Sequence, residues 1–249
     1  MRITKGALIA LVVLFTCHCE ADSQEIRIDH VVTVVADLDQ ATSRYTQLGF
    51  TVKQGRLHAN GLINGHVKFG NKTSLELMSV RGEPTDRMAR DYQTLLQEGE
   101  GGVYLAVSGV RTEEMEQMLS GLKIAFETSK GRSWDYITFP QEPELAHFFF
   151  IAYHGTMNDP GEITTHKNES DRITAAFIEG SERVSYFLKG IGLQSAGRKK
   201  DELFGSAERF FTASGDIIVV PKNESAKRPR LKAVSFGSSD GKESVRISF

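Results

Sequence analysis

The stretch from Ile26 to Val80 constrains the fold more than any other part of the chain. It begins with a nearly continuous apolar run rich in valine, Ile28 to Val35, which is typical of a strand buried on both faces. It ends with a second apolar strand that carries Glu76. A helix and a glycine-rich segment with two more strands lie between them. The predicted order is strand, helix and three strands.

The helix of this stretch has clear boundary signals. Asp37 and Gln40 have the spacing of an N-cap and a third helical residue, which is a capping-box pattern. Gly49 occupies the usual position just beyond a helix end. The residues expected on the apolar face of the helix are Leu38, Ala41, Tyr45 and Leu48.

The same order recurs along the chain, which predicts an α+β fold built from repeated βαβββ modules. Beyond a connecting helix near Arg87 to Glu98, a second module has strands at Val103–Ser108, Ile124–Thr128, Tyr136–Phe139 and His147–Tyr153, with a helix capped by Thr112. A third has strands at Ile173–Ile178, Arg209–Thr212 and Ile217–Val220, with a helix from Ser181. Two strands without a helix, Leu231–Phe236 and Val245–Phe249, follow as a fragmentary fourth module or as edge strands.

These repeats predict the organisation of the domains. Residues 1–21 are expected to be an export signal, residues 26–155 a pair of modules, and residues 171–249 the third module with the C-terminal strands. The polar segment 159–170 is expected to be a solvated linker, in which His166 to Asn168 could also close over a site. Paired modules are expected to form half-open barrel sheets.

The first residues have the layout of an export signal. Arg2 and Lys5 precede an apolar run, Ala7 to Phe15, that is too short to span a bilayer. We therefore expect a secreted or periplasmic protein without a transmembrane helix. Cys17 and Cys19 follow the run, so a lipid anchor at either cysteine, as in a bacterial lipoprotein, is an alternative to simple secretion.

Charge and cysteine content exclude several classes of function. The net charge of -2 gives no argument for binding nucleic acid. Because both cysteines belong to the expected signal, the mature domain has no internal disulfide and no thiolate metal site. A small-molecule ligand is the expected partner, and a homodimer is an open possibility.

Strand periodicity places a histidine and a carboxylate on strand faces that could meet. Strict alternation puts His30 on one face of its strand with Ile28 and Val32, and Glu76 on the face of its strand opposite to Leu75 and Leu77. A carboxylate on an apolar strand needs a partner, because its burial without one is costly. A divalent metal could be that partner. Alternatively, His30 makes a hydrogen bond in the core and Glu76 pairs with an arginine.

The repeated modules, with His on a first strand and Glu on a fourth, resemble the vicinal oxygen chelate superfamily, and within it the glyoxalase-like domain family. The resemblance covers residues 26–155 most clearly. Its residues are Ile28 to Val32, Asp37-Leu38, Leu48 to Phe50, Arg56 to His58, Asn64 and Leu75 to Leu77. It implies two modules around a divalent metal, and isomerases, extradiol dioxygenases, epimerases and thiol transferases as possible activities.

The second module departs from this pattern. The segments that align with His30 and Glu76 offer no ligand, so symmetry cannot complete a metal shell. His58 is the best additional ligand and a candidate catalytic group beside Glu76, giving two histidines and one carboxylate for zinc, manganese, iron or nickel. It could equally contact substrate or lie on an exposed hairpin. His147 is a second candidate.

Three residues are candidate substrate contacts. Asn64 could orient a substrate oxygen, although asparagine in a glycine-rich hairpin is usually a turn residue. Trp134 could line an apolar pocket with Tyr136, although core packing is the default for both. His147, at the start of a strand, completes the set.

Three functions are compatible with these patterns. The first is a metal-assisted enzyme, of isomerase, lyase or dioxygenase type, acting on a small oxygen-bearing molecule. The second is a metal-free protein that binds or sequesters a small molecule. The third is a structural module whose site is filled by side chains.

Overall fold

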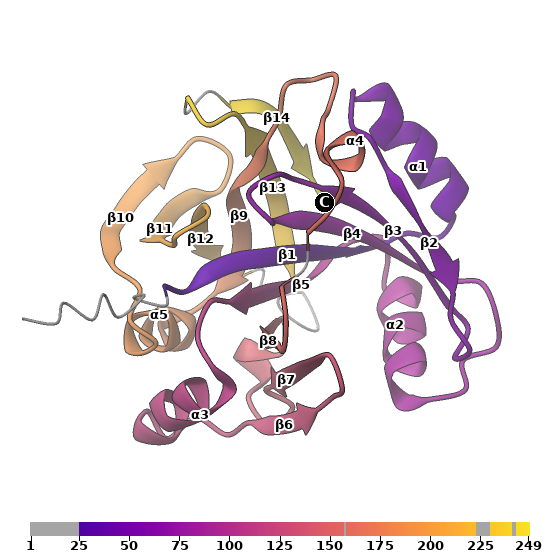
Figure 1. Ribbon diagram of the computed structural model, residues 1–249. Coiled ribbons are helices and arrows are strands. Elements are labelled where there is room, and N and C mark those ends of the chain that lie inside the picture. Colours follow the sequence, from indigo (N-terminus) through magenta and orange to yellow (C-terminus); the bar gives the residue numbers. More distant parts are fainter. Residues whose placement is uncertain (1–24, 157, 223–229, 241–242) are drawn as a thin grey trace, which may run out of the picture.

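The computed structural model describes residues 25–156, 158–222, 230–240 and 243–249 (Figure 1). These residues form a mixed α+β structure with two sheets. The expected export signal, including Cys17 and Cys19, lies outside the described residues. No helix in the described ranges is long and apolar enough to cross a membrane.

The first sheet has eight strands in the order β2-β3-β4-β1-β5-β8-β7-β6. The strands of its first half are β1 (Arg27–Val34), β2 (Lys53–Leu57), β3 (Leu62–Lys68) and β4 (Ser74–Val80). Those of its second half are β5 (Gly101–Ser108), β6 (Glu127–Lys130), β7 (Trp134–Thr138) and β8 (Phe148–Tyr153). In each half the first strand pairs in parallel with the last, and antiparallel β1 and β5 join the halves. The sheet stays open at β2 and β6, which confirms paired modules without a closed barrel.

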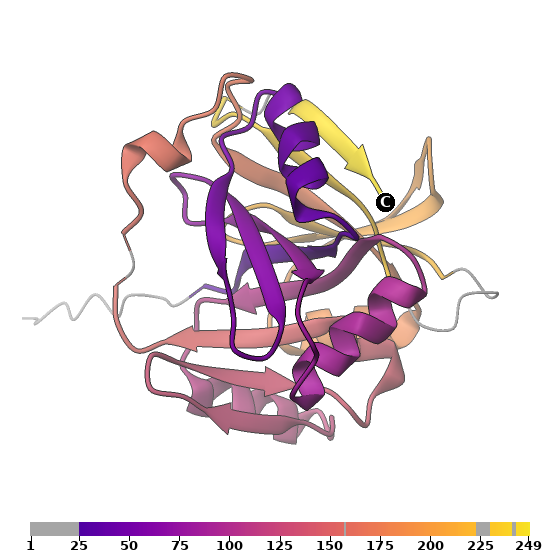
Figure 2. The same ribbon diagram turned by 90° about the vertical axis from the view of Figure 1, so that its right-hand side faces the viewer.

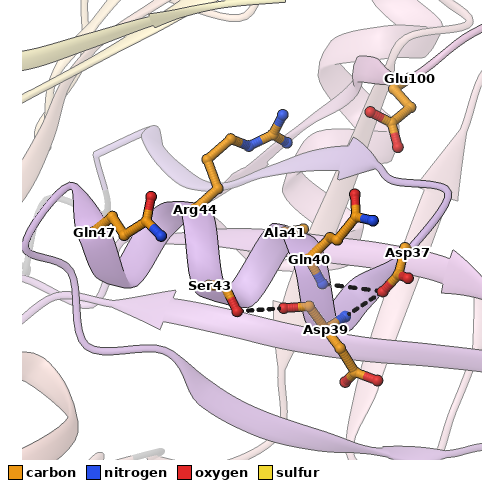
Figure 3. A pocket seen from close by; sticks show the side chains of 8 residues that line it. All are labelled: Asp37, Asp39, Gln40, Ala41, Ser43, Arg44, Gln47 and Glu100. Carbon is orange, nitrogen blue, oxygen red and sulfur yellow. Dashed lines mark hydrogen bonds between the residues drawn. The ribbon is translucent and has the colours of Figure 1, made fainter.

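The helices of the first half lie on opposite faces of the sheet. Asp37 caps α1 (Leu38–Gln47), accepting hydrogen bonds from the backbone nitrogens of Asp39 at 2.9 Å and Gln40 at 3.0 Å, as predicted (Figure 3). This helix packs on the face that carries Leu75 and Leu77. The connecting helix α2 (Arg87–Gln97) packs on the other face, against apolar residues of β1, β3 and β4. It presents Ala89 to the core, whereas the neighbouring Met88 is 54% exposed.

Each module ends its helix in the same way. Gly49, Lys123 and Gly192 follow α1, α3 (Thr112–Gly121) and α5 (Glu182–Gly190), and their φ angles are +86°, +54° and +99°. Left-handed backbone at this position terminates a helix and favours glycine. Three equivalent joints support three copies of one module. The predicted cap of α3 was one residue late, because Thr112 is the first helical residue and Arg111 precedes it.

The second sheet contains the third module and the C-terminal strands in the order β10-β11-β12-β9-β13-β14. Its strands are β9 (Arg172–Gly180), β10 (Ser195–Asp201), β11 (Gly205–Phe211), β12 (Asp216–Pro221), β13 (Leu231–Gly237) and β14 (Glu243–Ser248). The antiparallel β9–β13 pair repeats the β1–β5 pair, and β14 closes the sheet as an antiparallel edge strand. The strand β10 was not predicted, because its mostly exposed polar residues show no apolar alternation.

The two sheets share one hydrophobic core. Figure 1 shows the third module, in orange, and the C-terminal strands, in yellow, beside β1 and β5. Phe236 of β13 lies with its ring 4.9 Å from that of Phe50 and 5.6 Å from that of Phe69. A side chain at Gly102 of β5 would meet Leu231 and Phe249 at 2.6 Å. The segments 26–155 and 171–249 therefore pack as close neighbours across the back of the first sheet.

The linker is more ordered than the sequence predicted. It contains the short helix α4 (Gly161–Thr164) and runs along the outer side of the molecule (Figure 2). His166 is buried, accepts a hydrogen bond from the Thr51 nitrogen at 3.0 Å, and lies 3.0 Å from the Lys68 carbonyl oxygen. The expectation of a solvated loop is therefore wrong at His166. Its partners lie about a hundred residues earlier, which no local pattern reveals.

Candidate functional site

The site lies on the face of the first sheet that carries Glu76. Leu75 and Leu77 are fully buried in the shared core, so the alternation of β4 turns Glu76 to the opposite face, as predicted. This face, on which α2 packs against Val32, Val34 and Met78, is called the open face. The adjacent strand β3 pairs His66 with Glu76. Directly paired residues present their side chains to the same face. β3 therefore adds polar side chains to this face at Asn64, His66 and Lys68.

A β-bulge in β1 alters the predicted face of its residues. The pairing of β1 with β5 shifts between Ile28 and His30, which leaves Asp29 as the extra residue. Ile28 and Val31 both lie in the shared core, and His30 contacts Glu76 on the other side. Strict alternation had placed Ile28 with His30, and this part of the prediction was wrong. The bulge brings the Asp29 carboxylate beside His30 on the open face.

Asp29, His30 and Glu76 form a short polar chain. His30 Nδ1 lies 2.6 Å from Asp29 Oδ1, which also accepts a hydrogen bond from the Tyr153 hydroxyl at 3.0 Å. On the other side of the ring, His30 Nε2 lies 3.8 Å from Glu76 Oε2. That separation is too long for a hydrogen bond. The Nε2 atom and the carboxylate oxygen therefore make no direct hydrogen bond to each other.

Asn64 and His66 border the other oxygen of Glu76. The Asn64 side-chain amide donates to Glu76 Oε1 at 2.8 Å and lies 3.2 Å from His66 Nε2. His66 Nε2 is itself 3.7 Å from Glu76 Oε1. Asn64 thus stands between the carboxylate and the second histidine, and it holds Glu76 in one orientation.

The charges of the site favour a protonated His30. Burial by itself would lower the pKa of His30, but the hydrogen bond and charge of Asp29 and the charge of Glu76 raise it above the ordinary 6.5. For Asp29, burial acts in the opposite direction and would raise the pKa. The contacts of Asp29 with His30, Ser108 and Tyr153 nevertheless bring its pKa below the ordinary value. Protonated His30 contributes stability below pH 6.5. That contribution is lost as the pH rises through the folded-state pKa.

His66 is neutral at physiological pH. Burial lowers its pKa to about 4, although the nearby charge of Glu76 acts in the opposite direction. An amide donor facing Nε2 requires the ring proton on Nδ1. That buried Nδ1 has no partner among the residues that the structure describes. The site therefore pairs one histidine that is readily protonated with one that is not.

The second module supplies an aromatic wall in place of further polar groups. Gly49 and Lys123 are equivalent positions of the two modules, and the same offset in residue number makes Tyr104 equivalent to His30. Phe149 of β8 pairs with β5 as Glu76 of β4 pairs with β1. The Phe149 ring lies 5.4 Å from the His30 ring, 6.1 Å from Tyr104 and 5.8 Å from Tyr136. Burial and the charge of Glu76 raise the pKa of Tyr136 to about 12. These aromatic residues explain why the second module has no ligand to offer.

The structure brings only part of the predicted set together. His30, Glu76 and Asn64 form one cluster, and Trp134 reaches it indirectly, with its ring 6.3 Å from that of Tyr136. His58 lies at the turn between β2 and β3, and within the described chain no side-chain contact joins it to Glu76. The roles assigned from the sequence remain predictions.

His147 occupies an apolar position. It is 2% exposed, and burial lowers the pKa of its ring to about 3. Neither ring nitrogen has a partner in the described part of the chain. The ring lies against Phe148 at 4.5 Å, so the closest contact that the structure gives this side chain is apolar.

Asp29, His66 and Lys68 were not among the predicted site residues. The signal for the last two was present, because Asn64, His66 and Lys68 alternate with Gly65 and Val67 along one strand. A period of two indicates one polar face on β3. Asp29 had no such signal, since a bulge depends on how two strands pair.

The donor atoms do not form a closed metal shell. His30, His66 and Glu76 have the donor types of a two-histidine, one-carboxylate site. In the described ranges, however, no group of three or more His, Cys, Asp or Glu side chains is placed to hold an ion. The Asn64 amide instead lies between His66 and Glu76. In this arrangement the residues do not fit a tightly held divalent metal.

Two hollows lie in other parts of the surface, and the second borders the cluster only through Tyr153. One of about 520 Å³ lies beside α1 and includes Glu100 (Figure 3). The other, of about 490 Å³, lies at the start of α3, beside Arg111 and the Asp135–His154 ion pair. Neither is lined by His30 or Glu76. The candidate site is a partly exposed cluster, with 12% of the His30 side chain and 13% of the Glu76 side chain accessible.

Asp29 should control the charge of His30. We expect Asp29→Asn to lower the pKa of His30 below the ordinary value, because burial then outweighs the remaining charge of Glu76. Titration of the His30 ring by NMR measures this, with His154 as the internal reference. An unchanged His30 titration would contradict the role of the bulge.

The comparisons with known proteins identify the family of the chain. The sequence profile of the glyoxalase-like domain family matches residues 28–189, which is more than half of the chain. The chain belongs to the glyoxalase-like domain family. This confirms the glyoxalase-like domain family predicted from the sequence. The match spans the first two modules and continues into α5 of the third.

The solved structures that match this glyoxalase-like protein have low sequence identity to it. A hypothetical protein from Staphylococcus aureus, 13% identical, covers 82% of this chain and 88% of its own with a TM-score of 0.58. A methylmalonyl-CoA epimerase variant from Streptomyces coelicolor, 17% identical, covers 53% of this chain and 98% of its own with a TM-score of 0.41. The epimerase from Mycobacterium tuberculosis, 20% identical, covers 55% and 91% with a TM-score of 0.40. No curated protein matches the sequence.

Proposed function

We propose that His30 and Glu76 form the proton-transfer site of an enzyme that isomerises or epimerises a small oxygen-bearing molecule. The observation that carries the proposal is the Asp29–His30–Glu76 chain, with a contact of 2.6 Å on one side of the imidazole and a gap of 3.8 Å on the other. Asp29 holds the ring so that Nε2 points at the gap. The aromatic wall of the second module gives the remainder of a ligand an apolar surface.

The two groups have complementary roles in such a reaction. Glu76 removes a proton from the carbon next to a substrate carbonyl, and the electron pair of the broken C–H bond moves to the carbonyl oxygen. Protonated His30 donates its Nε2–H to that oxygen and stabilises the negative charge. Return of the proton to either face of the carbon, or to the neighbouring carbon, gives an epimer or an isomer. His30 needs only the protonation state that its surroundings favour.

Solvent hydrogen exchange tests the proposal without knowledge of the natural substrate. We expect the full-length protein in D2O to exchange hydrogens next to the carbonyl of hydroxyacetone, glyceraldehyde or pyruvate, followed by proton NMR. His30→Gln should slow this exchange by about 10²–10³-fold, because it removes the charged donor to the oxyanion. Glu127→Gln is the control, since Glu127 is exposed on β6. Equal exchange in the wild type and His30→Gln would overturn the proposal.

Metal content separates this proposal from the metal-assisted enzyme expected from the sequence. Because the donors do not form a closed shell, we expect protein purified without chelator to hold well below one divalent ion per chain. Plasma mass spectrometry of the wild type and Glu76→Ala measures this. About one ion per chain, lost in Glu76→Ala, would favour the metal-assisted reaction instead.

We propose further that the protein acts after export. The support is the sequence alone, in which Arg2 and Lys5 precede the apolar run from Ala7 to Phe15. Mass spectrometry of the mature N-terminus tests the proposal. Cleavage near residue 21 supports secretion or periplasmic location, and an acylated Cys17 or Cys19 supports a lipid anchor. An intact N-terminus would contradict both.

A further inference from the structure

Lys68 stands in the same row of the sheet as His30. It pairs with Ser74 across β3 and β4, and Ser74 pairs with His30 across β4 and β1. Directly paired side chains lie on one face, with neighbouring strands about 4.8 Å apart. A cation, a hydroxyl and an imidazole therefore follow one another across the open face, one row from Glu76.

The Lys68 ammonium is largely enclosed and has a single counter-ion. Its side chain is 15% exposed, and Nζ contacts Asp159 Oδ2 at 2.7 Å. Lys53 reaches the other oxygen of Asp159 at 3.7 Å. Asp159 is the only carboxylate at ion-pair distance from Lys68 in the described part of the chain. The charge of Lys68 also acts on His30 and His66, in each case toward a lower pKa, although the pKa of His30 is raised overall.

Asp159 comes from the linker and not from the sheet. The linker is fixed against the first module just beyond it, where Thr51 donates to the Thr165 carbonyl oxygen at 2.7 Å and His166 contacts the Lys68 carbonyl oxygen. A buried cation requires an anion nearby. The chain itself thus supplies the carboxylate that pairs with Lys68. Ser74, which pairs with Lys68 across β3 and β4, makes no side-chain hydrogen bond within the described residues.

We propose that Lys68 and Ser74 form a carboxylate subsite of the proton-transfer site, and that Asp159 occupies it when no ligand is bound. The substrate class is then a small oxo or hydroxy carboxylic acid. Its carboxylate binds at Lys68 and its carbonyl faces His30. The inference rests on the proposed function for the position of the reacting atoms, but the anion subsite can be tested separately.

The test compares two probes that differ in one group. Pyruvate and hydroxyacetone share a methyl ketone, and only pyruvate carries a carboxylate. NMR titration of the backbone amides of β1, β3 and β4 gives the affinity of each probe for the full-length protein. We expect Lys68→Gln to weaken pyruvate binding by about 10-fold or more, because it removes a charged hydrogen-bond donor. Hydroxyacetone has no carboxylate, so Lys68→Gln should change its binding by less than about twofold.

Asp159→Asn distinguishes anion binding from loosening of the linker. Both substitutions break the Lys68–Asp159 ion pair. Only Asp159→Asn removes the competing carboxylate, so it should tighten pyruvate binding by about three- to tenfold. Lys199→Gln, which removes an exposed lysine of β10, is the charge-matched control.

Each outcome of these titrations supports or overturns the proposed carboxylate subsite. Opposite effects of Lys68→Gln and Asp159→Asn on pyruvate support it. Equal effects of the two substitutions in the same direction, or no effect of either, overturn it. The absence of saturable pyruvate binding in both the wild type and Asp159→Asn also overturns it. Failure of the proposed function appears elsewhere, as hydrogen exchange that does not depend on His30. If pyruvate binding depends on Lys68 but hydrogen exchange does not depend on His30, the carboxylate subsite is supported and the proposed proton-transfer reaction is excluded.

Discussion

Glu76→Gln should lower the rate of hydrogen exchange at the substrate carbon by about 10²–10⁴-fold, the range that a positioned general base contributes. Glutamine has nearly the same shape as glutamate, but its amide cannot accept the carbon-bound proton. Proton NMR in D2O, with the substrate that the wild type exchanges fastest, measures the loss. Because Asn64 can still contact the side-chain oxygen at position 76, the fold is expected to persist.

Controls separate chemistry from structure in this experiment. Circular dichroism and the thermal midpoint should show that Glu76→Gln is folded, and Glu127→Gln should exchange at the wild-type rate. The substitution also removes a negative charge that raises the pKa of His30, so the His30 titration should move toward lower pH. A folded Glu76→Gln protein with undiminished exchange would exclude Glu76 as the base.

The sequence contained enough local information to find half of the site. His30 and Glu76 lie on strands with strong apolar patterns, and one period-two argument turned Glu76 toward the open face, where the structure has it. Asn64 was found by its place in the family pattern. His66 and Lys68 belong to the same strand as Asn64, and extending the alternation along that strand would have found them.

The remainder depends on contacts between distant segments. Asp29 reaches His30 only because the pairing of β1 with β5 contains a bulge. Asp159 reaches Lys68 only because the linker is held by Thr51 and His166. The strand β10 escaped detection for a different reason. Backbone pairing with β11 maintains it, while most of its side chains face solvent and leave no periodic signal.

Phe236→Ala should destabilise the whole protein by about 3–5 kcal/mol, the cost of emptying a phenylalanine site in a packed core. Phe236 is fully buried in β13, and its ring packs against Phe50 and Phe69 from the first module. The cavity would therefore open between the two sheets, where neither can close it alone. Urea unfolding followed by circular dichroism measures the free energy of unfolding.

The form of the transition is as informative as its midpoint. If one core stabilises both sheets, Phe236→Ala should shift a single cooperative transition with little change in its slope. Phe211→Ala is the matched control, because this phenylalanine of β11 is 45% exposed and should cost less than about 1 kcal/mol. Two separate transitions, with only the later one weakened, would show that residues 171–249 unfold independently. The first sheet would then hold the Glu76 site without support from the C-terminal strands.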